Sequence, residues 1–224
     1  MNQAHIDFWL SEFEPFTTAV VANGEVPASE LSVRLLRKMK RVVCCDGALQ
    51  KLLSVNIIPD VVVGDGDSMD REELSRYGIP YHADKSEEYN DLTKAFNYCE
   101  ANGFHTVAIV GGCGLREDHT LANISLLMGY AERFEVIMVT NYGIFTPILK
   151  THTFQSHQGD AVSVFSFTPK THLTFHGLKY PVNNRCFNHL WEGSLNEALA
   201  DKFTVELHDE GRILVYQAFK KENS

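Results

Sequence analysis

The sequence lacks features that would place it in a membrane or outside the cell. No apolar run reaches about 18 residues, the length that a membrane-spanning helix needs. The five cysteines are odd in number and include no C-x-x-C pair, which argues against a disulfide framework and a zinc knuckle. Residues 1–16 hold no Lys or Arg ahead of an apolar run, so we expect no secretory signal. Free thiols fit a reducing compartment, and we expect a cytoplasmic protein with no membrane partner.

Positive charge is also scarce. Twenty Lys and Arg stand against 29 Asp and Glu, a net charge of −9 with neutral His. We therefore expect no nucleic-acid partner, because such a surface is usually basic. Phosphate binding would need a metal ion or backbone N–H groups to supply local positive charge. The chain also has no G-x-S-x-G nucleophile elbow and no Walker P-loop.

The composition is that of an ordinary globular protein. The 224 residues are 44% apolar and 22% charged, which allows a sizeable core in one large domain or two small ones. In the first part of the chain, β-rich runs alternate with helical patterns, which predicts a parallel sheet with helices on both faces. The expected strands are 17–22, 41–45, 61–63, 106–110 and 135–140, and the expected helices are 29–40, 48–55, 91–102 and 117–130.

Helical periodicity stops after Asn141. The rest of the chain holds short β-rich runs separated by turn residues, which is typical of a β-sandwich or small barrel. These runs are 144–149, 161–167, 173–176, 203–207 and 212–216. We therefore expect a Rossmann-like α/β catalytic domain at 1–145 and a C-terminal all-β sandwich domain at 146–224.

Polar and glycine-rich segments follow three of the expected strands. These segments are Asp46-Gly47, then 64–68, then 111–114 leading to Arg116, Asp118 and His119. In open parallel α/β sheets, ligands bind beyond the carboxyl ends of the strands. If the strands are neighbours, the three loops converge there, and backbone N–H groups of the glycine-rich loop can face an anion.

Asp65 and Asp67 are the sharpest feature of these loops. Two carboxylates two residues apart, next to Gly64 and Gly66, form a compact oxygen-rich turn. Mg²⁺ prefers hard oxygen ligands and usually takes one or two carboxylates plus phosphate and water. An ordinary Asp/Gly turn is the competing interpretation.

Other candidate residues also have ordinary structural interpretations. Asp91 begins an expected helix, where it is either an N-terminal cap or first-turn acid or a third metal ligand. Arg116 is either an exposed side chain or a phosphate contact. A lone His119 within a helix is more often structural than functional.

Taken in order, the motifs resemble the thiamine pyrophosphokinase family. They run from about Val20 to Tyr216 and comprise C-D-G-A at 45–48, P-D-V-V-V-G-D-G-D-S at 59–68, N-D-L-T-K-A at 90–95, G-G at 111–112 with R-E-D-H at 116–119 and Asn123, G-L-K-Y-P at 177–181 and G-S-L-N-E at 193–197. The chain departs from the family pattern at Ala48, at Gly66 in place of a common aromatic residue, at Asn90 and at Leu195.

The resemblance implies transfer of pyrophosphate from ATP to the hydroxyethyl group of thiamine, giving thiamine diphosphate and AMP. It also implies a homodimer that binds thiamine between the α/β domain of one subunit and the β domain of the other. The resemblance implies that Asp65, Asp67 and Asp91 bind Mg²⁺ and that these residues act in catalysis with Asp46. It implies ATP binding by Gly24, Asp46, Gly47, Gly112, Arg116 and His119. It implies thiamine binding by Asp118, Ser194 and Asn196.

The residue pattern leaves two other functional classes open. A D-x-D glycosyltransferase or nucleotidyltransferase would also hold Mg²⁺ or Mn²⁺ on Asp65 and Asp67. A non-catalytic module that binds a nucleotide or thiamine would need no turnover.

Overall fold

The computed structural model describes residues 1–25 and 29–220. The chain separates into two compact units. The first, here called the α/β unit, comprises Asn2–Leu126 and Arg133–Asn141; the second, the β unit, comprises Met1, Leu127–Glu132 and the chain from Tyr142 onward. The division after residue 145 stays a prediction, and the last four residues of that expected second domain, 221–224, lie outside the described part.

The α/β unit is built on six parallel strands. In spatial order these are β6 (Glu135–Val139), β5 (Thr106–Val110), β1 (Thr18–Val21), β2 (Arg41–Cys45), β3 (Val61–Gly64) and β4 (Tyr81–Ala83). Central Val20 pairs with Val43 on one side and Ile109 on the other. All three are buried, as the continuous apolar runs predict for strands covered on both faces.

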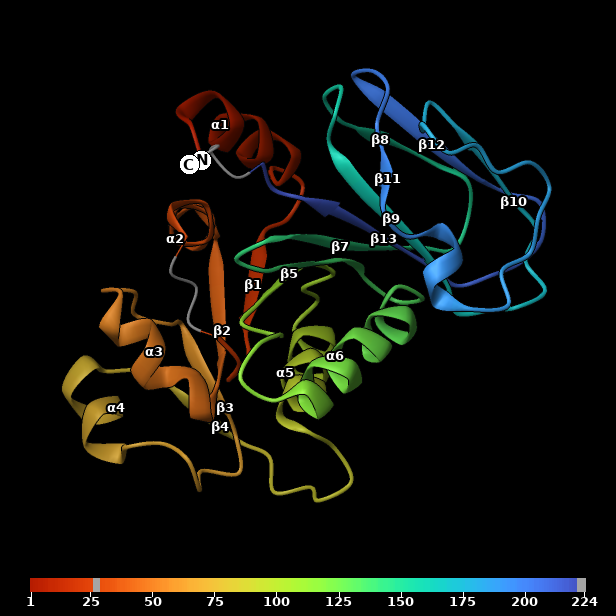
Figure 1. The fold of residues 1–224 in the computed structure, drawn as a ribbon. Coiled ribbons are helices and arrows are strands. Elements are labelled where there is room, and N and C mark those ends of the chain that lie inside the picture. The colour runs from red at the N-terminus through yellow and green to blue at the C-terminus, as the bar shows by residue number, and fades with distance from the viewer. Residues whose placement is uncertain (26–28, 221–224) are drawn as a thin grey trace. The chain divides into compact units, whose positions relative to one another are not determined.

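Helices flank these strands on both sides (Figure 1). Helices α2 (Glu30–Lys38) and α3 (Leu49–Ser54) lie on one side, and α5 (Asp91–Ala101) and α6 (Glu117–Tyr130) lie on the other. This is what right-handed crossovers produce when the strand order reverses between β1 and β5. Ser29 and Asn90 cap α2 and α5 by accepting hydrogen bonds from backbone N–H groups.

Two α-helices and one strand of the α/β unit were not predicted from the sequence. Helix α1 (Gln3–Glu12) buries Ile6, Trp9 and Leu10, and its first turn is capped by Asn2. The other two are α4 (Arg71–Tyr77) and β4. Helix α4 and strand β4 are short, and β4 is mostly exposed. Neither therefore has the periodic apolar pattern from which helices and strands were predicted.

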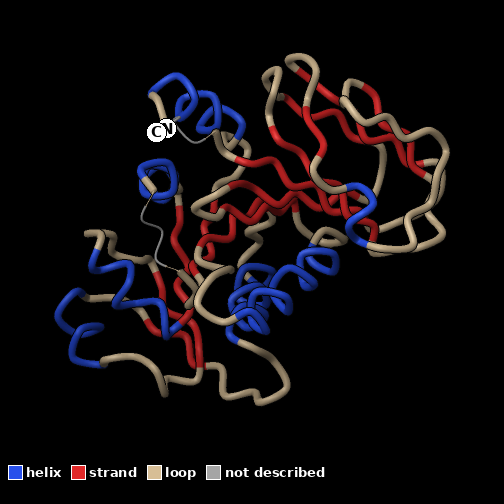
Figure 2. Tube along the Cα trace, viewed as in Figure 1, coloured by secondary structure: helices blue, strands red, loops and turns tan. Residues whose placement is uncertain are grey.

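The β unit consists of two antiparallel sheets (Figure 2). One contains β11 (Asn196–Glu197), β9 (Ala161–Ser166), β13 (Ile213–Ala218) and β7 (Gly143–Ile148); the other contains β10 (Leu173–His176), β12 (Lys202–Leu207) and β8 (His152–Gln155). Residues of both sheets, including Val164 and Val215 from one and Phe203 and Val205 from the other, share one buried cluster. The predicted α/β domain followed by an all-β sandwich is therefore confirmed. No helix in the described ranges is both long and apolar enough to cross a membrane.

Candidate active site

A cleft of about 1040 Å³ opens in the α/β unit at the carboxyl ends of its strands. Its walls come from the segments that follow β1, β2, β3, β4 and β5. The strand order reverses at β1 and β5, and this switch point is where open α/β sheets bind ligands. Seven of the residues singled out from the sequence line the cleft: Gly24, Asp65, Asp67, Asp91, Gly112, Arg116 and His119.

The Asp65-Gly66-Asp67 turn follows β3 and is held by its own backbone. Asp65 Oδ1 accepts a hydrogen bond from the Asp67 N–H at 3.1 Å. Gly66 has a φ of +90°, which an L residue adopts only with strain. A Cβ at Gly66 would also lie 2.8 Å from Tyr81 Oη, so the ring of Tyr81 fills the space beside this glycine. Tyr81 Oη donates to the Gly64 carbonyl at 2.9 Å and thereby ties β4 to the start of the turn.

Asp46 supports that turn from beneath. Its side chain is 2% exposed and accepts hydrogen bonds from the backbone N–H of Gly47 at 2.6 Å and of Gly66 at 3.1 Å. Burial raises the pKa of the Asp46 carboxyl, while these two hydrogen bonds act in the opposite direction. Among the residues that the structure describes, neither Asp46 nor Gly47 forms part of the cleft wall.

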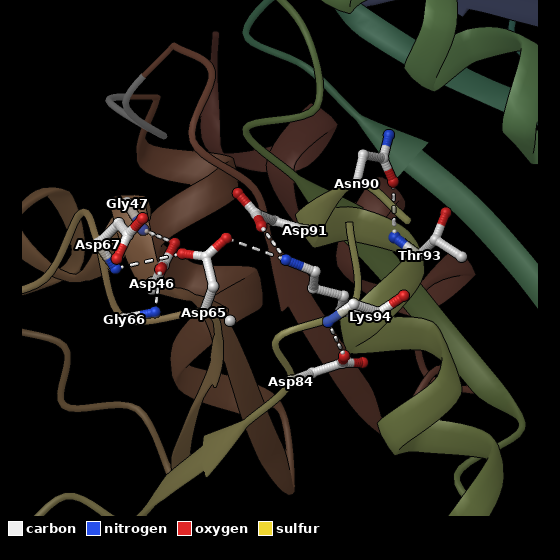
Figure 3. Close-up of polar contacts among 12 residues, drawn as sticks. Asp46, Gly47, Asp65, Gly66, Asp67, Asp84, Asn90, Asp91, Thr93 and Lys94 are labelled. Atoms are coloured by element: carbon white, nitrogen blue, oxygen red, sulfur yellow. Dashed lines mark hydrogen bonds and ion pairs between the residues drawn. The ribbon is translucent and has the colours of Figure 1, made fainter. Parts of the chain in front are cut away.

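Asp91 faces the cleft rather than capping its helix. The cap of α5 is Asn90, whose side chain accepts from the Thr93 N–H at 2.9 Å. Asp91 Oδ1 lies 3.5 Å from Lys94 Nζ, and Asp65 Oδ2 lies 3.1 Å from the same nitrogen. Figure 3 shows the ammonium group joined to both carboxylates by dashed lines. The structure thus brings Asp65 and Asp91 together through a lysine to which the sequence analysis assigned no role.

The loop after β1 and the glycine-rich loop after β5 meet on the other side of the cleft. The Gly24 N–H donates to the Gly111 carbonyl at 2.7 Å, and the Glu25 N–H donates to Cys113 at 2.7 Å. A Cβ at Gly24 would overlap the Gly111 and Cys113 carbonyl oxygens, so only glycine fits there. Lys51 Nζ donates to the carbonyls of Asn23 at 2.8 Å and Gly24 at 2.6 Å.

Several cleft residues were missed by the sequence analysis as site residues, and four of them carry local contacts or charge in the cleft. They are Lys51, Arg71, Lys94 and Asn123. Asn123 Nδ2 donates to the Gly112 carbonyl at 2.8 Å, which fixes the glycine-rich loop to α6. The sequence carried a signal for two of them, because Lys94 and Asn123 both fall within the motifs of the family resemblance.

Asp118 pairs with Arg116 at the start of α6. Arg116 donates to both carboxylate oxygens, from Nε at 3.1 Å and from Nη2 at 2.6 Å. The Arg116 hydrogen bond lowers the pKa of Asp118 to about 2, with a further contribution from the His119 N–H. Both side chains are exposed, so this pair adds little to stability.

Ser194 and Asn196 belong to the β unit, and both are engaged locally. Ser194 Oγ donates to the Trp191 carbonyl at 2.7 Å. Buried Asn196 accepts from the Tyr180 N–H at 2.9 Å and donates to the Tyr180 carbonyl at 2.8 Å. Its carboxamide therefore bonds both backbone polar groups of Tyr180, as a residue on a neighbouring β-strand would.

The donors of the cleft suit a hard divalent cation. Asp65, Asp67 and Asp91 all present carboxylate oxygens to the same cleft, which is the ligand chemistry that Mg²⁺ prefers. The described residues contain no ready-made group of three or more His, Cys, Asp or Glu arranged around a metal position. Lys94 accounts for part of this, since its ammonium already lies against two of the three carboxylates.

Family models match both units of the chain. Residues 33–139 match the model described as thiamin pyrophosphokinase, catalytic domain, and residues 143–216 match that described as thiamin pyrophosphokinase, substrate-binding domain. A relative, thiamin pyrophosphokinase 1 of Caenorhabditis elegans, is 27% identical over 127 residues. That alignment covers 52% of this chain and 52% of the relative, so the chain matches about half of its length.

Solved structures share the fold. A thiamine pyrophosphokinase from Bacillus subtilis superposes with a TM-score of 0.78 at 20% identity, covering 91% of this chain and 99% of that one. The thiamin pyrophosphokinase from Candida albicans gives 0.78 at 19% identity, covering 94% and 91%. The yeast enzyme gives 0.76 at 16% identity, covering 92% and 87%.

Proposed function

The chain belongs to the thiamin pyrophosphokinase family, and from that premise we propose that it transfers pyrophosphate from ATP to the hydroxyethyl group of thiamine. The products are thiamine diphosphate and AMP. The observation that carries the proposal is one cleft that these residues line together. Asp65 and Asp67 face it from the turn after β3, Asp91 faces it from the start of α5, and the loops after β1 and β5 meet on its other side. Carboxylates for a metal and close backbone for phosphates are the parts that such a reaction needs.

The reaction forms one bond and breaks one. The hydroxyl oxygen of thiamine attacks the β-phosphorus of ATP, and the bond from that phosphorus to the oxygen bridging it to the α-phosphate breaks. The hydroxyl proton is released, and AMP leaves with the bridging oxygen. The protein's part is to align the two substrates and to balance the phosphate charge.

The metal side of the site consists of Asp65, Asp67 and Asp91. Mg²⁺ held by these residues would neutralise ATP oxygens and polarise the attacked phosphorus. Asp46 acts beneath them by holding the Gly66 N–H, and so sets the path of the turn that presents Asp65 and Asp67.

The phosphate side consists of Gly24, Gly112 and the start of α6. Gly24 and Gly112 line the cleft, and each lets the backbone pack closely at this wall: a Cβ at Gly24 would meet the Gly111 and Cys113 carbonyls, and one at Gly112 would meet Met138. Arg116 supplies a charge-assisted hydrogen-bond donor, and His119 lines the same wall. Gly47 contributes to ATP binding indirectly, through its hydrogen bond to Asp46.

The thiamine side consists of Asp118, Ser194 and Asn196. Asp118 stays ionised at neutral pH, which suits a cationic thiazolium ligand. Asn196 acts through Tyr180, whose backbone it holds and whose ring is exposed.

These residues lie in two units, and we propose a homodimer in which each site is shared between subunits. The β unit exposes apolar side chains around Asn196: Leu195 is 85% exposed and Trp191 is 71% exposed. Leu195 also has a φ of +58°, which is rare for a bulky residue. Large exposed apolar side chains at a strained position favour a surface that a second copy of the chain covers.

The cysteines bear on where the protein works. All five are free thiols, and Cys44, Cys45 and Cys99 are buried. A chain of this kind needs no oxidising compartment to fold, and we propose the cytoplasm as its location.

A substrate-omission assay tests the proposed activity. Purified protein is incubated with ATP and Mg²⁺, with or without thiamine, and thiamine diphosphate is separated by chromatography. We expect ATP consumption only when thiamine is present. In a parallel reaction that supplies a nucleotide sugar and no thiamine, consumption of that sugar would instead indicate a D-x-D transferase. Binding of ATP and thiamine without any product would indicate a binding module.

A further inference from the structure

Lys94 is a buried cation in an acidic site. Its side chain is 4% exposed, whereas its partners Asp65 and Asp91 are 41% and 44% exposed. Burying an ammonium group is costly unless it is paired and hydrogen-bonded. The distances of 3.1 Å to Asp65 and 3.5 Å to Asp91 supply that pairing. The lysine therefore faces the two carboxylates from the protein side, while their other faces are open to the cleft.

The local fold keeps Lys94 in this place. Lys94 lies one turn after Asp91 on α5, and the neighbouring side chains Leu92, Ala95 and Phe96 are buried. Lys94 is an ammonium ion at neutral pH, because lysine is a strong base and two carboxylates lie within 3.5 Å of its Nζ.

Lys94 uses ligand oxygens that a metal ion would need. Asp65 has both oxygens engaged, Oδ1 with the Asp67 N–H and Oδ2 with Lys94. Asp91 has Oδ1 engaged with the same ammonium. A divalent cation entering this site alone would have to share these oxygens and would be repelled by the ammonium charge.

We propose that Lys94 is a resident counter-ion of the candidate metal site, which positions Asp65 and Asp91 without metal and keeps the affinity for free Mg²⁺ low. The metal then enters as its complex with a nucleotide polyphosphate, whose negative charge offsets the ammonium. The inference rests on the metal role in the proposed function. Lys94 is a positioning residue in this account, since its contacts are with Asp65 and Asp91.

Mn²⁺ binding in the absence of nucleotide tests the proposal. The variants are Lys94→Met and, as a matched control, Lys85→Met, which removes the same charge from an exposed side chain of the same cleft. Free Mn²⁺ is followed by electron paramagnetic resonance. We expect Lys94→Met to bind Mn²⁺ at least about tenfold more tightly than wild type, because a like charge a few ångströms away is gone. Lys85→Met should change the affinity by less than about threefold, because solvent screens its charge.

A merely structural lysine would give the opposite result, since its loss would loosen the carboxylates and weaken binding. Equal or weaker Mn²⁺ binding by Lys94→Met overturns the proposal. If that variant does not fold without metal, it is refolded in Mg²⁺ and, separately, in sodium chloride of equal ionic strength. Recovery in Mg²⁺ alone supports the proposal, and recovery in neither or in both overturns it.

Wild-type protein provides a second readout. Its melting temperature should be nearly the same in EDTA and in millimolar Mg²⁺, because Lys94 already balances the carboxylates. Strong stabilisation by Mg²⁺ alone contradicts the proposal. None of these measurements uses thiamine, so a protein that meets them and makes no thiamine diphosphate would refute the proposed function only.

Discussion

At the residue scale, the two aspartates after β3 are held differently. Asp65 is fixed by the Asp67 N–H and by Lys94, and these hydrogen bonds lower the pKa of its carboxyl. Asp67 contributes its N–H to that arrangement and presents its carboxylate to the cleft. We infer that the Asp65 carboxylate keeps a fixed position, whereas the Asp67 carboxylate can adjust to a metal–nucleotide complex.

Removing either charge should abolish most activity. We expect Asp65→Asn and Asp67→Asn each to lower kcat by at least about 100-fold, because the site loses its main compensation for phosphate charge. Circular dichroism should show both variants folded, since neither side chain is buried. Glu88→Gln, an exposed acid outside the cleft wall, is the matched control. Near-normal turnover in both aspartate variants would remove the metal role.

Asp118 offers a pH measurement. Its folded-state pKa of about 2 lies below the ordinary value because of Arg116. A depressed carboxyl pKa contributes stability above the unfolded pKa and loses it as pH falls through the folded one. We expect NMR titration to place the Asp118 pKa near 2, and Arg116→Met to move it up toward the ordinary value. An unchanged pKa in that variant would show that the ion pair does not form in solution.

At the scale of elements, the loops after β1 and β5 form one structural piece. Backbone hydrogen bonds join Gly24 to Gly111 and Glu25 to Cys113, and Lys51 reaches across to the carbonyls of Asn23 and Gly24. The two loops lie so close together that a side chain at position 24 would overlap the backbone of the second loop.

Gly24→Ala should therefore open this contact. We expect a loss of about 1–3 kcal/mol in the free energy of unfolding, because a backbone carbonyl must move to admit the methyl group. Gly129→Ala is the control, since a Cβ there meets nothing within 4 Å in helix α6. That change should raise stability by about 0.5–1 kcal/mol through helix propensity. Urea denaturation measures both, and equal effects of the two variants would contradict the close approach.

Some elements could be predicted from the sequence and others could not, for physical reasons. Strands such as β1, β3 and β5 are continuous apolar runs, and α2 and α5 have clear caps and apolar faces, so their patterns are strong. Strand β4 is three residues long and largely exposed, and its register comes from pairing with β3 rather than from its own composition. The ordered loops predicted a cleft at the strand ends. Lys94 and Asp65 lie 29 residues apart in the sequence, and no local pattern predicts that their side chains meet.

At the scale of the whole molecule, the proposed site residues are divided between two units. Asp65, Asp67 and Asp91 belong to the α/β unit, whereas Ser194 and Asn196 belong to the β unit. If subunits share each site, an Asp67→Asn chain and an Asn196→Ala chain carry complementary defects. A mixed dimer would then hold one site with both defects and one site with neither.

Co-refolding the two variants tests this sharing. We expect recovery of roughly a quarter of wild-type activity if mixing is random and the sites are independent. Each parent must be nearly inactive alone, and mass measurements must confirm the mixed dimer. No recovery under those conditions would mean that each site is built within one chain.

The most direct test of the central claim is the identity of the nucleotide product. Purified protein is given ATP, Mg²⁺ and thiamine, and phosphorus NMR or chromatography follows AMP, ADP and both thiamine phosphates. A pyrophosphate transfer predicts AMP and thiamine diphosphate in equal amounts, with no ADP formed alongside them. ADP in step with thiamine monophosphate would contradict the account and show that the cleft transfers a single phosphoryl group.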